Sequence, residues 1–273
     1  MKRTIIVVDD FSPSAHNAMD YGCRLAADAD ARVVILRIYT LPVSYSSDAI
    51  ALSTLKDDYD TNQDRLEHDA NEWRERFPDV HIDARLVTGG LIECLRDQVY
   101  DVNPDLIVMG APRNYDELWT WDSEMLNSLT ALTAPVLLIP MHIKYKATQN
   151  IGFACDYQTV LVPGQVNFLK LLINTTHACL HVVHVATKAP RSEEIAHENE
   201  AMINELLTDI QPTYYKMESQ EVIESIAHFV KEHNLDFLVV IPHRHGLWYN
   251  IFHQSHTKQL AKLNHIPVLA LQD

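Results

Sequence analysis

Residues 105–109 read DLIVM and residues 236–240 read DFLVV, so one strand-like sequence occurs twice in this chain of 273 residues. Each copy is a short apolar run that begins with an aspartate. A short apolar run containing β-branched residues is typical of a strand that is buried on both faces of a parallel sheet. The duplication indicates that the chain contains two copies of one structural unit.

Four further pairs of segments occur in the same order in both copies. They are residues 4–10 and 150–156, 33–39 and 180–185, 85–87 and 214–217, and 134–139 and 266–271. The interval between partners falls from about 146 residues for the first pair to about 132 for the last. The first copy therefore contains roughly 15 additional residues between its second and third strands, and we place them within residues 41–77.

Amphipathic helical patterns separate these strands. We expect helices over residues 14–28, 55–77, 91–102, 123–133, 222–233 and 255–264. The order within each copy is then β-α-β-α-β-α-β-α-β. The fold class that follows is α/β, with two tandem copies of a five-stranded, mainly parallel sheet that carries helices on both faces. We place the domains at residues 1–142 and 148–273, joined by the polar stretch 141–149.

Composition narrows the function classes. The net charge is −15, with 14 basic and 24 acidic residues up to residue 146 and 8 and 13 after it. Both copies are acidic and neither has a basic stripe, which argues against nucleic-acid binding. No apolar run approaches the roughly 18–20 residues of a membrane span, and the N-terminus lacks a signal-like apolar region. We therefore expect a cytoplasmic protein that does not act in a membrane.

Cysteines and histidines offer no recognisable metal or redox motif. We expect small buried thiols at the four cysteines, which form no C-x-x-C pair: Cys23, Cys94, Cys155 and Cys179. The densest group of histidines comprises His243, His245, His253, His256 and His265. Without a nearby cysteine or carboxylate at ligand spacing, these are predicted to be solvated loop residues and not a zinc site.

The paired motifs resemble the universal stress protein family over nearly the whole chain. The features that carry this resemblance are the aspartate after the first strand, the DLIVMG run of residues 105–110, and a serine followed at fixed spacing by Pro-Val-Leu. Ser123 precedes Pro135, and Ser255 precedes Pro267, at identical spacing. The resemblance implies the Rossmann-like architecture of the adenine nucleotide alpha hydrolases in each copy.

Nucleotide-binding members of that family carry G-x-x-G-(nine residues)-G-[ST] after the fourth strand. There, backbone N–H groups and a helix N-terminus receive phosphate oxygens. In the first copy, the resemblance points to Asp10, Gly110, Arg113 and Ser123 as an ATP site with Mg²⁺. Asp122 occupies the last glycine position, where its charge would oppose phosphate. The alternative is structural: Asp10 caps a loop, Gly110 permits a turn, and Ser123 caps a helix.

The second copy departs further from this motif. Its three glycine positions hold Ile241, Arg244 and Gln254, and Pro242 lacks an N–H group. We expect no nucleotide there. Aromatic residues flank both altered loops, and they either fill a vacated cleft or form a patch for a protein partner. They are Trp119 and Trp121 in the first copy and Trp248, Tyr249 and Phe252 in the second.

The sequence therefore predicts a stress-response or regulatory binding module without catalytic activity, acting with a protein partner. The alternatives are an ATP-binding switch that uses the first copy alone and a pure protein-interaction scaffold. In members of the family that the chain resembles, the last strand often pairs with its equivalent in another subunit. The resemblance therefore implies that residues 136–139 and 268–271 pair with each other within this chain, which would satisfy two exposed sheet edges. This pairing makes the chain an intramolecular pseudo-dimer, which then exists as a monomer or a homodimer.

Overall fold

The computed structural model describes residues 3–40, 49–111, 132–155, 157, 160–186, 193–242 and 263–272. Residues 123–131 and 255–262 of two predicted helices lie outside the described residues, as do most of the histidine group and the aromatic residues that flank the loops. The domain boundaries at 142 and 148 stay a prediction.

The first repeat forms a five-stranded parallel sheet with the strand order β3-β2-β1-β4-β5. Its described elements are β1 (Arg3–Asp9), α1 (Pro13–Asp28), β2 (Ala31–Tyr39), α2 (Ala49–Arg76), β3 (Ile82–Thr88), α3 (Leu91–Val102), β4 (Leu106–Ala111) and β5 (Val136–Pro140).

The second repeat has the equivalent parallel order β8-β7-β6-β9-β10. Its described elements are β6 (Asn150–Cys155), α5 (Pro163–Thr176), β7 (Cys179–Ala186), α6 (Glu193–Leu206), β8 (Thr213–Glu218), α7 (Val222–Glu232), β9 (Phe237–Val240) and β10 (Val268–Ala270). The same strand order in both halves confirms the predicted fold class.

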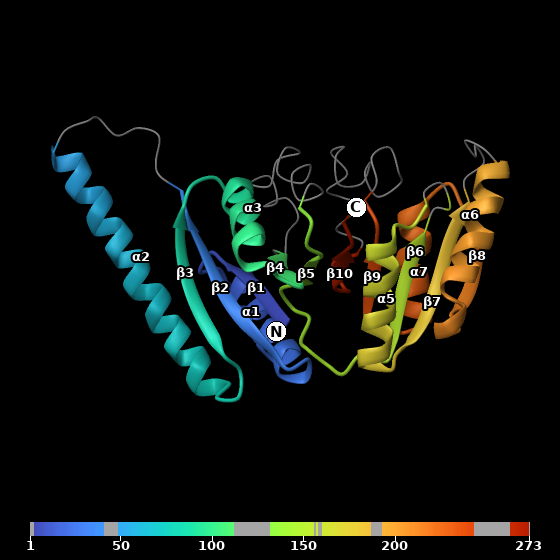
Figure 1. Ribbon diagram of the computed structural model, residues 1–273, viewed down its shortest axis with the longest axis horizontal. Coiled ribbons are helices and arrows are strands. Elements are labelled where there is room, and N and C mark those ends of the chain that lie inside the picture. The colour runs from blue at the N-terminus through green and yellow to red at the C-terminus, as the bar shows by residue number, and fades with distance from the viewer. Residues whose placement is uncertain are drawn as a thin grey trace.

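The strands β5 and β10 join the two repeats into one ten-stranded sheet (Figure 1). They pair antiparallel, with Val268 opposite Leu138, Leu269 opposite Leu137, and Ala270 opposite Val136. The predicted pairing of the last strands is thus confirmed. It satisfies the edge of each repeat with the edge of the other, so that two exposed rows of backbone hydrogen-bonding groups are removed at once.

The additional residues of the first repeat form a longer helix. Helix α2 has 28 residues, whereas its counterpart α6 has 14. Leu66, Ala70 and Trp73 are buried on its C-terminal half, and Arg74 Nε donates to the Ile82 carbonyl at 2.9 Å. Helix α2 therefore packs along β3 at one end of the sheet (Figure 1), and the predicted position of the insertion is confirmed.

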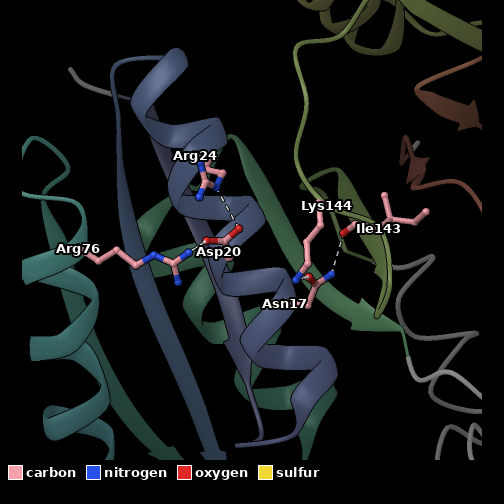
Figure 2. Close-up of polar contacts among 6 residues, drawn as sticks. All are labelled: Asn17, Asp20, Arg24, Arg76, Ile143 and Lys144. Atoms are coloured by element: carbon pink, nitrogen blue, oxygen red, sulfur yellow. Dashed lines mark hydrogen bonds and ion pairs between the residues drawn. The ribbon is translucent and has the colours of Figure 1, made fainter.

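Helix α1 is fixed by its cap and by polar side chains. Its cap is Ser12, whose Oγ accepts from the Ala15 N–H at 3.1 Å, and Pro13 supplies a preset φ in the first turn. Two turns into the helix, the carboxylate of Asp20 pairs with Arg24 at 3.0 Å and with Arg76 of α2 at 2.6 Å (Figure 2). The pair with Arg76 ties the C-terminal end of α2 to α1.

Asn17, on the other flank of α1, holds the segment that leaves β5. Its Nδ2 donates to the carbonyl of Pro140 at 3.1 Å. The same Nδ2 donates to the carbonyl of Ile143 at 2.9 Å, and Oδ1 accepts from Lys144 Nζ at 2.8 Å (Figure 2). Asn17 is only 4% exposed. The predicted linker is therefore docked on the first repeat through a buried amide.

In each repeat, the aspartate that precedes the fourth strand accepts a hydrogen bond from a backbone N–H at the start of the first strand. Asp105 Oδ2 accepts from the Thr4 N–H at 2.8 Å, and Asp236 Oδ2 accepts from the Asn150 N–H at the same distance. Asp236 also accepts from the Gln149 N–H at 2.6 Å and pairs with Lys146 at 2.5 Å. The aspartate of the duplicated run is therefore a structural cap in both repeats.

The prediction that all four cysteines are buried is wrong for two of them. Cys23 and Cys94 are buried, but Cys155 is half-buried and Cys179 is exposed. Cys179 is the first residue of β7 and lies at the surface. The apolar residues around it indicate that the strand is buried, but they do not indicate that its first residue is buried.

We predict that Asp236→Asn destabilises the fold by on the order of 2 kcal/mol at neutral pH, because it replaces the charged acceptor of three interactions. Burial alone would raise the pKa of Asp236, but Lys146 and the N–H groups of Asn150 and Gln149 lower it below its ordinary value. The contribution is therefore present above the unfolded pKa of about 4 and is lost as the pH falls through the folded pKa.

Urea unfolding of the wild type and Asp236→Asn at neutral and acidic pH measures this dependence. Asp105→Asn is the matched control, because Asp105 is exposed and, among the described residues, its carboxylate has the Thr4 N–H as its hydrogen-bond donor and no lysine contact. We expect a smaller loss in this control. An equal loss at both pH values would contradict the assignment of the effect to the Asp236 charge.

Candidate functional site

The candidate site of each repeat lies where the strand order reverses. The first repeat reverses between β1 and β4, and the second between β6 and β9. In sheets of this type, ligands bind in the crevice outside the carboxyl ends of the two strands at that switch point. Asp10 follows β1, and Gly110 is near the end of β4, so the structure brings these two predicted residues to the same crevice.

The Asp10 side chain is engaged within its own loop. Asp10 is exposed, and its Oδ1 accepts from the Ser12 N–H at 2.9 Å. This is the Asx-turn geometry that leads the chain into a helix. The same Ser12 caps α1, so Asp10 supports the start of the helix, and the structural alternative accounts for the contact that is observed.

Gly110 permits a close approach between β4 and α1. A Cβ at this position would lie 2.4 Å from both the carbonyl carbon and the oxygen of Ser14 and 2.8 Å from the nitrogen of Ala15. All three are backbone atoms, which cannot move aside without displacing the helix. The absence of a side chain at Gly110 is therefore required by packing, whether or not a ligand binds nearby.

Phe11 follows Asp10 in a left-handed conformation with φ of 62°. Its ring contacts two guanidinium groups, with the central carbon of Arg37 at 4.3 Å and that of Arg65 at 3.9 Å from the ring centroid. This double cation–π contact brings one cation from β2 and one from α2 to the end of β1. None of these three residues was predicted from the sequence as part of the site.

The neighbouring backbone and carboxylate complete this cluster. Arg37 Nη1 donates to the Asp9 carbonyl at 3.3 Å, and Arg37 Nη2 donates to Asn62 Oδ1 at 3.4 Å. The Phe11 N–H donates to Asp9 Oδ1 at 3.2 Å. Burial raises the pKa of the Asp9 carboxyl, while the Phe11 N–H and Arg37 act in the opposite direction. The first repeat thus presents both signs of charge at its switch point.

The second repeat contains an equivalent arrangement without a guanidinium group. Tyr157 is at the position of Phe11, also has a positive φ, of 53°, and is only 3% exposed. Its ring stacks on His184 of β7 with centroids 4.5 Å apart. His184 Nδ1 lies 3.0 Å from the Cys155 carbonyl oxygen, as Arg37 contacts the Asp9 carbonyl. An aromatic residue therefore closes the end of the first strand in both repeats.

The end of β9 is also filled by apolar side chains. Ile241 is 6% exposed and Pro242 is buried, so these replacements for glycine and its neighbour belong to the core. The other predicted residues of the two loops lie outside the described residues. They are Arg113, Asp122 and Ser123 in the first repeat and Arg244, Gln254 and Ser255 in the second. The assignment of Asp10, Gly110, Arg113 and Ser123 to a nucleotide site stays a prediction.

Residues 1–119 match the model of the universal stress protein family. The first repeat is a universal stress protein domain. The predicted resemblance is confirmed for the first repeat by this match, and the second repeat has the same strand order.

Solved structures share the architecture over the full length. A universal stress protein from Archaeoglobus fulgidus is 13% identical, with a TM-score of 0.68, and the match covers 98% of this chain and 96% of that one. A functionally unknown protein from Pseudomonas aeruginosa is 14% identical over 99% and 92% of the two chains, with a TM-score of 0.57. At these identities the likeness establishes the fold. No curated protein matches the chain.

A universal stress protein from Arabidopsis thaliana with AMP bound matches 53% of this chain and 93% of its own, at 18% identity and a TM-score of 0.35. The bound AMP is an observation on the Arabidopsis protein only. Among the residues that the structure describes, the charged side chains near the end of β1 in the first repeat are Asp9, Asp10, Arg37 and Arg65. Within the described residues, no group of three or more histidine, cysteine or acidic side chains is arranged to hold a metal ion, and no helix is long and apolar enough to cross a membrane.

Gly110→Ala is predicted to lower the free energy of unfolding by about 1–3 kcal/mol or more, because the added methyl group meets the backbone of α1. Chemical denaturation measures the change. Gly164→Ala is the matched control, since a Cβ there meets nothing within 4 Å in the first turn of α5, and we expect its stability to equal or slightly exceed that of the wild type. Equal stability of the two variants would show that β4 and α1 are not tightly packed at Gly110.

Proposed function

We propose that this tandem universal stress protein is a stress-response or regulatory binding module without catalytic activity, which acts through a protein partner. The observation that best supports the proposal is how the two switch points are occupied. At each, the loop after the first strand turns an aromatic residue, Phe11 or Tyr157, back against the second strand. Side chains that would otherwise face a substrate are engaged in holding the fold together.

The chemistry of the described groups agrees with this proposal. The Asp10 carboxylate accepts a hydrogen bond from its own loop. Gly110 is in contact with α1, and Ile241 is buried in the second repeat. A general acid or base has to reach a substrate atom from a concave site, and a nucleophile needs an adjacent base. The described switch points offer neither arrangement.

The alternative is an ATP-binding switch that uses the first repeat with Mg²⁺. The specific observation in its favour is the pair of cations at Phe11, because guanidinium groups recognise phosphate well. Asp9 and Asp10 could contact the adenosine end or the metal ion. The second repeat has a tyrosine and a histidine in place of this cluster, so any nucleotide would bind to one repeat only.

Incubation with ATP and Mg²⁺ tests the proposal through two readouts, phosphate release and the melting temperature. We expect phosphate release no greater than that of a heat-inactivated sample. A ligand that binds only the native state must raise its stability, so the melting temperature reports binding independently of turnover. Turnover that is lost in Asp10→Asn would contradict the absence of catalysis.

Single substitutions separate the alternative from the proposal. Under the alternative, ATP with Mg²⁺ raises the melting temperature of the wild type, and the rise is lost in Asp10→Asn and Arg65→Gln. The rise is kept in the control Asp156→Asn, which changes the aspartate that corresponds to Asp10 in the second repeat. Asp122→Gly should strengthen such binding, because it removes a negative charge from the phosphate loop. Under the proposal, none of these proteins responds to the nucleotide.

A further inference from the structure

A pocket of about 200 Å³ lies at the joint between the two repeats, beneath the antiparallel pair β5–β10. Its walls are the C-terminal ends of α1 and α5, and residues 145–148 of the linker pass along it. Figure 1 shows α1 and α5 on either side of the linker, which runs between the halves at this end of the molecule. Pockets between domains are common ligand sites.

The floor of this pocket is apolar and is built equally by both repeats. Leu106 and Leu137 of the first repeat correspond to Phe237 and Leu269 of the second, and all four are at most 8% exposed. The half-buried rings of Phe168 and Tyr145 line its sides. Such a lining favours a flat apolar molecule, because aromatic rings pack well edge-to-face against one another.

The hydroxyl of Tyr21 is a polar group in this apolar lining. Tyr21 is 5% exposed, and its ring meets the ring of Tyr145 edge-on with centroids 5.0 Å apart. Among the residues that the structure describes, no hydrogen bond to the Tyr21 hydroxyl is found, and its oxygen is not one of the fully enclosed polar atoms without a partner. Because Tyr21 lines the pocket, a ligand there could exchange a hydrogen bond with this hydroxyl.

The charges around the pocket select against anions. Asp28 lies at its mouth and accepts a hydrogen bond from the Tyr145 hydroxyl at 2.5 Å. Burial and the nearby charge of Asp236 raise the pKa of Tyr21, which keeps its hydroxyl neutral. The cation closest to Asp236, Lys146, is paired with that aspartate at 2.5 Å. A carboxylate or phosphate in the pocket would therefore face uncompensated negative charge.

We propose that this pocket binds one neutral aromatic molecule, of one ring or two fused rings, which exchanges a hydrogen bond with the Tyr21 hydroxyl. The size agrees, because an apolar cavity of about 150 Å³ accommodates benzene. The site is independent of the switch points, since it contains none of the residues assigned to nucleotide binding. Because both repeats and the linker line it, an occupant would stabilise the joint between them.

Titration calorimetry with indole as the probe tests this proposal on the full chain. We expect saturable binding of one indole per chain, and no binding of benzoate, which is of similar size but anionic. Tyr21→Phe keeps the ring and removes the hydroxyl, so it should weaken indole binding about tenfold. Leu172→Trp should abolish binding, because Leu172 lines the pocket and the larger side chain fills it.

Leu171→Trp is the matched control, since Leu171 is 43% exposed on the same helix and does not line the pocket. This variant should bind indole as the wild type does. Loss of binding in Leu172→Trp alone, with an unchanged circular dichroism spectrum, supports the site. Absence of indole binding to the folded wild type, equal binding by Leu172→Trp, or equal binding of benzoate overturns the proposal.

If Leu172→Trp does not fold, nuclear Overhauser effects in the wild type decide the location. Indole in the pocket should give effects to the ring protons of Tyr145 and Phe168. Effects only to other aromatic side chains would place the indole elsewhere and overturn the proposal.

Discussion

The antiparallel pairing of β5 with β10 is the constraint on which the rest of the structure depends. Three residue pairs across this joint turn two five-stranded sheets into one. The joint sets α1 beside α5, determines the path of the linker between Asn17 and Asp236, and creates the pocket that lies beneath it. A slip by one residue would reverse which side chains face that pocket, since the side chains of a strand alternate between faces.

In this chain, residues of the sequence motifs that resemble the family have structural roles. The aspartate of the duplicated run caps the first strand, and Gly110 lets a helix touch a strand. A motif residue kept for packing looks the same in sequence as one kept for a ligand. The second-strand residue that contacts the aromatic side chain after the first strand is an arginine in one repeat and a histidine in the other. The architecture can thus be preserved while the local chemistry diverges.

The strands, their order of appearance and the inserted helix could be predicted because each leaves a periodic or duplicated pattern in the sequence. The joint was predicted from the resemblance to a family whose last strands pair. The geometry of the site could not. The left-handed backbone of Phe11 and Tyr157 is unusual for aromatic residues, and the repetition of an aromatic after each strand-end aspartate was the available signal. The contact of Arg65 with Phe11 joins residues far apart in sequence, and only tertiary packing determines it. The prediction that Cys179 is buried failed because the first residue of a strand can be exposed while the next is buried.

The joint between the repeats also has a consequence for synthesis of the chain. Strand β5 ends at Pro140, and its partner β10 begins only at Val268. At the usual rate of translation, the first repeat exists for on the order of ten seconds before β10 has been made. During that interval β5 is an unpaired apolar edge, which is a template for association with other nascent chains. A chaperone that covers this edge, or early pairing with a neighbouring copy on the same messenger RNA, would therefore decide how much of the protein reaches its intramolecular arrangement.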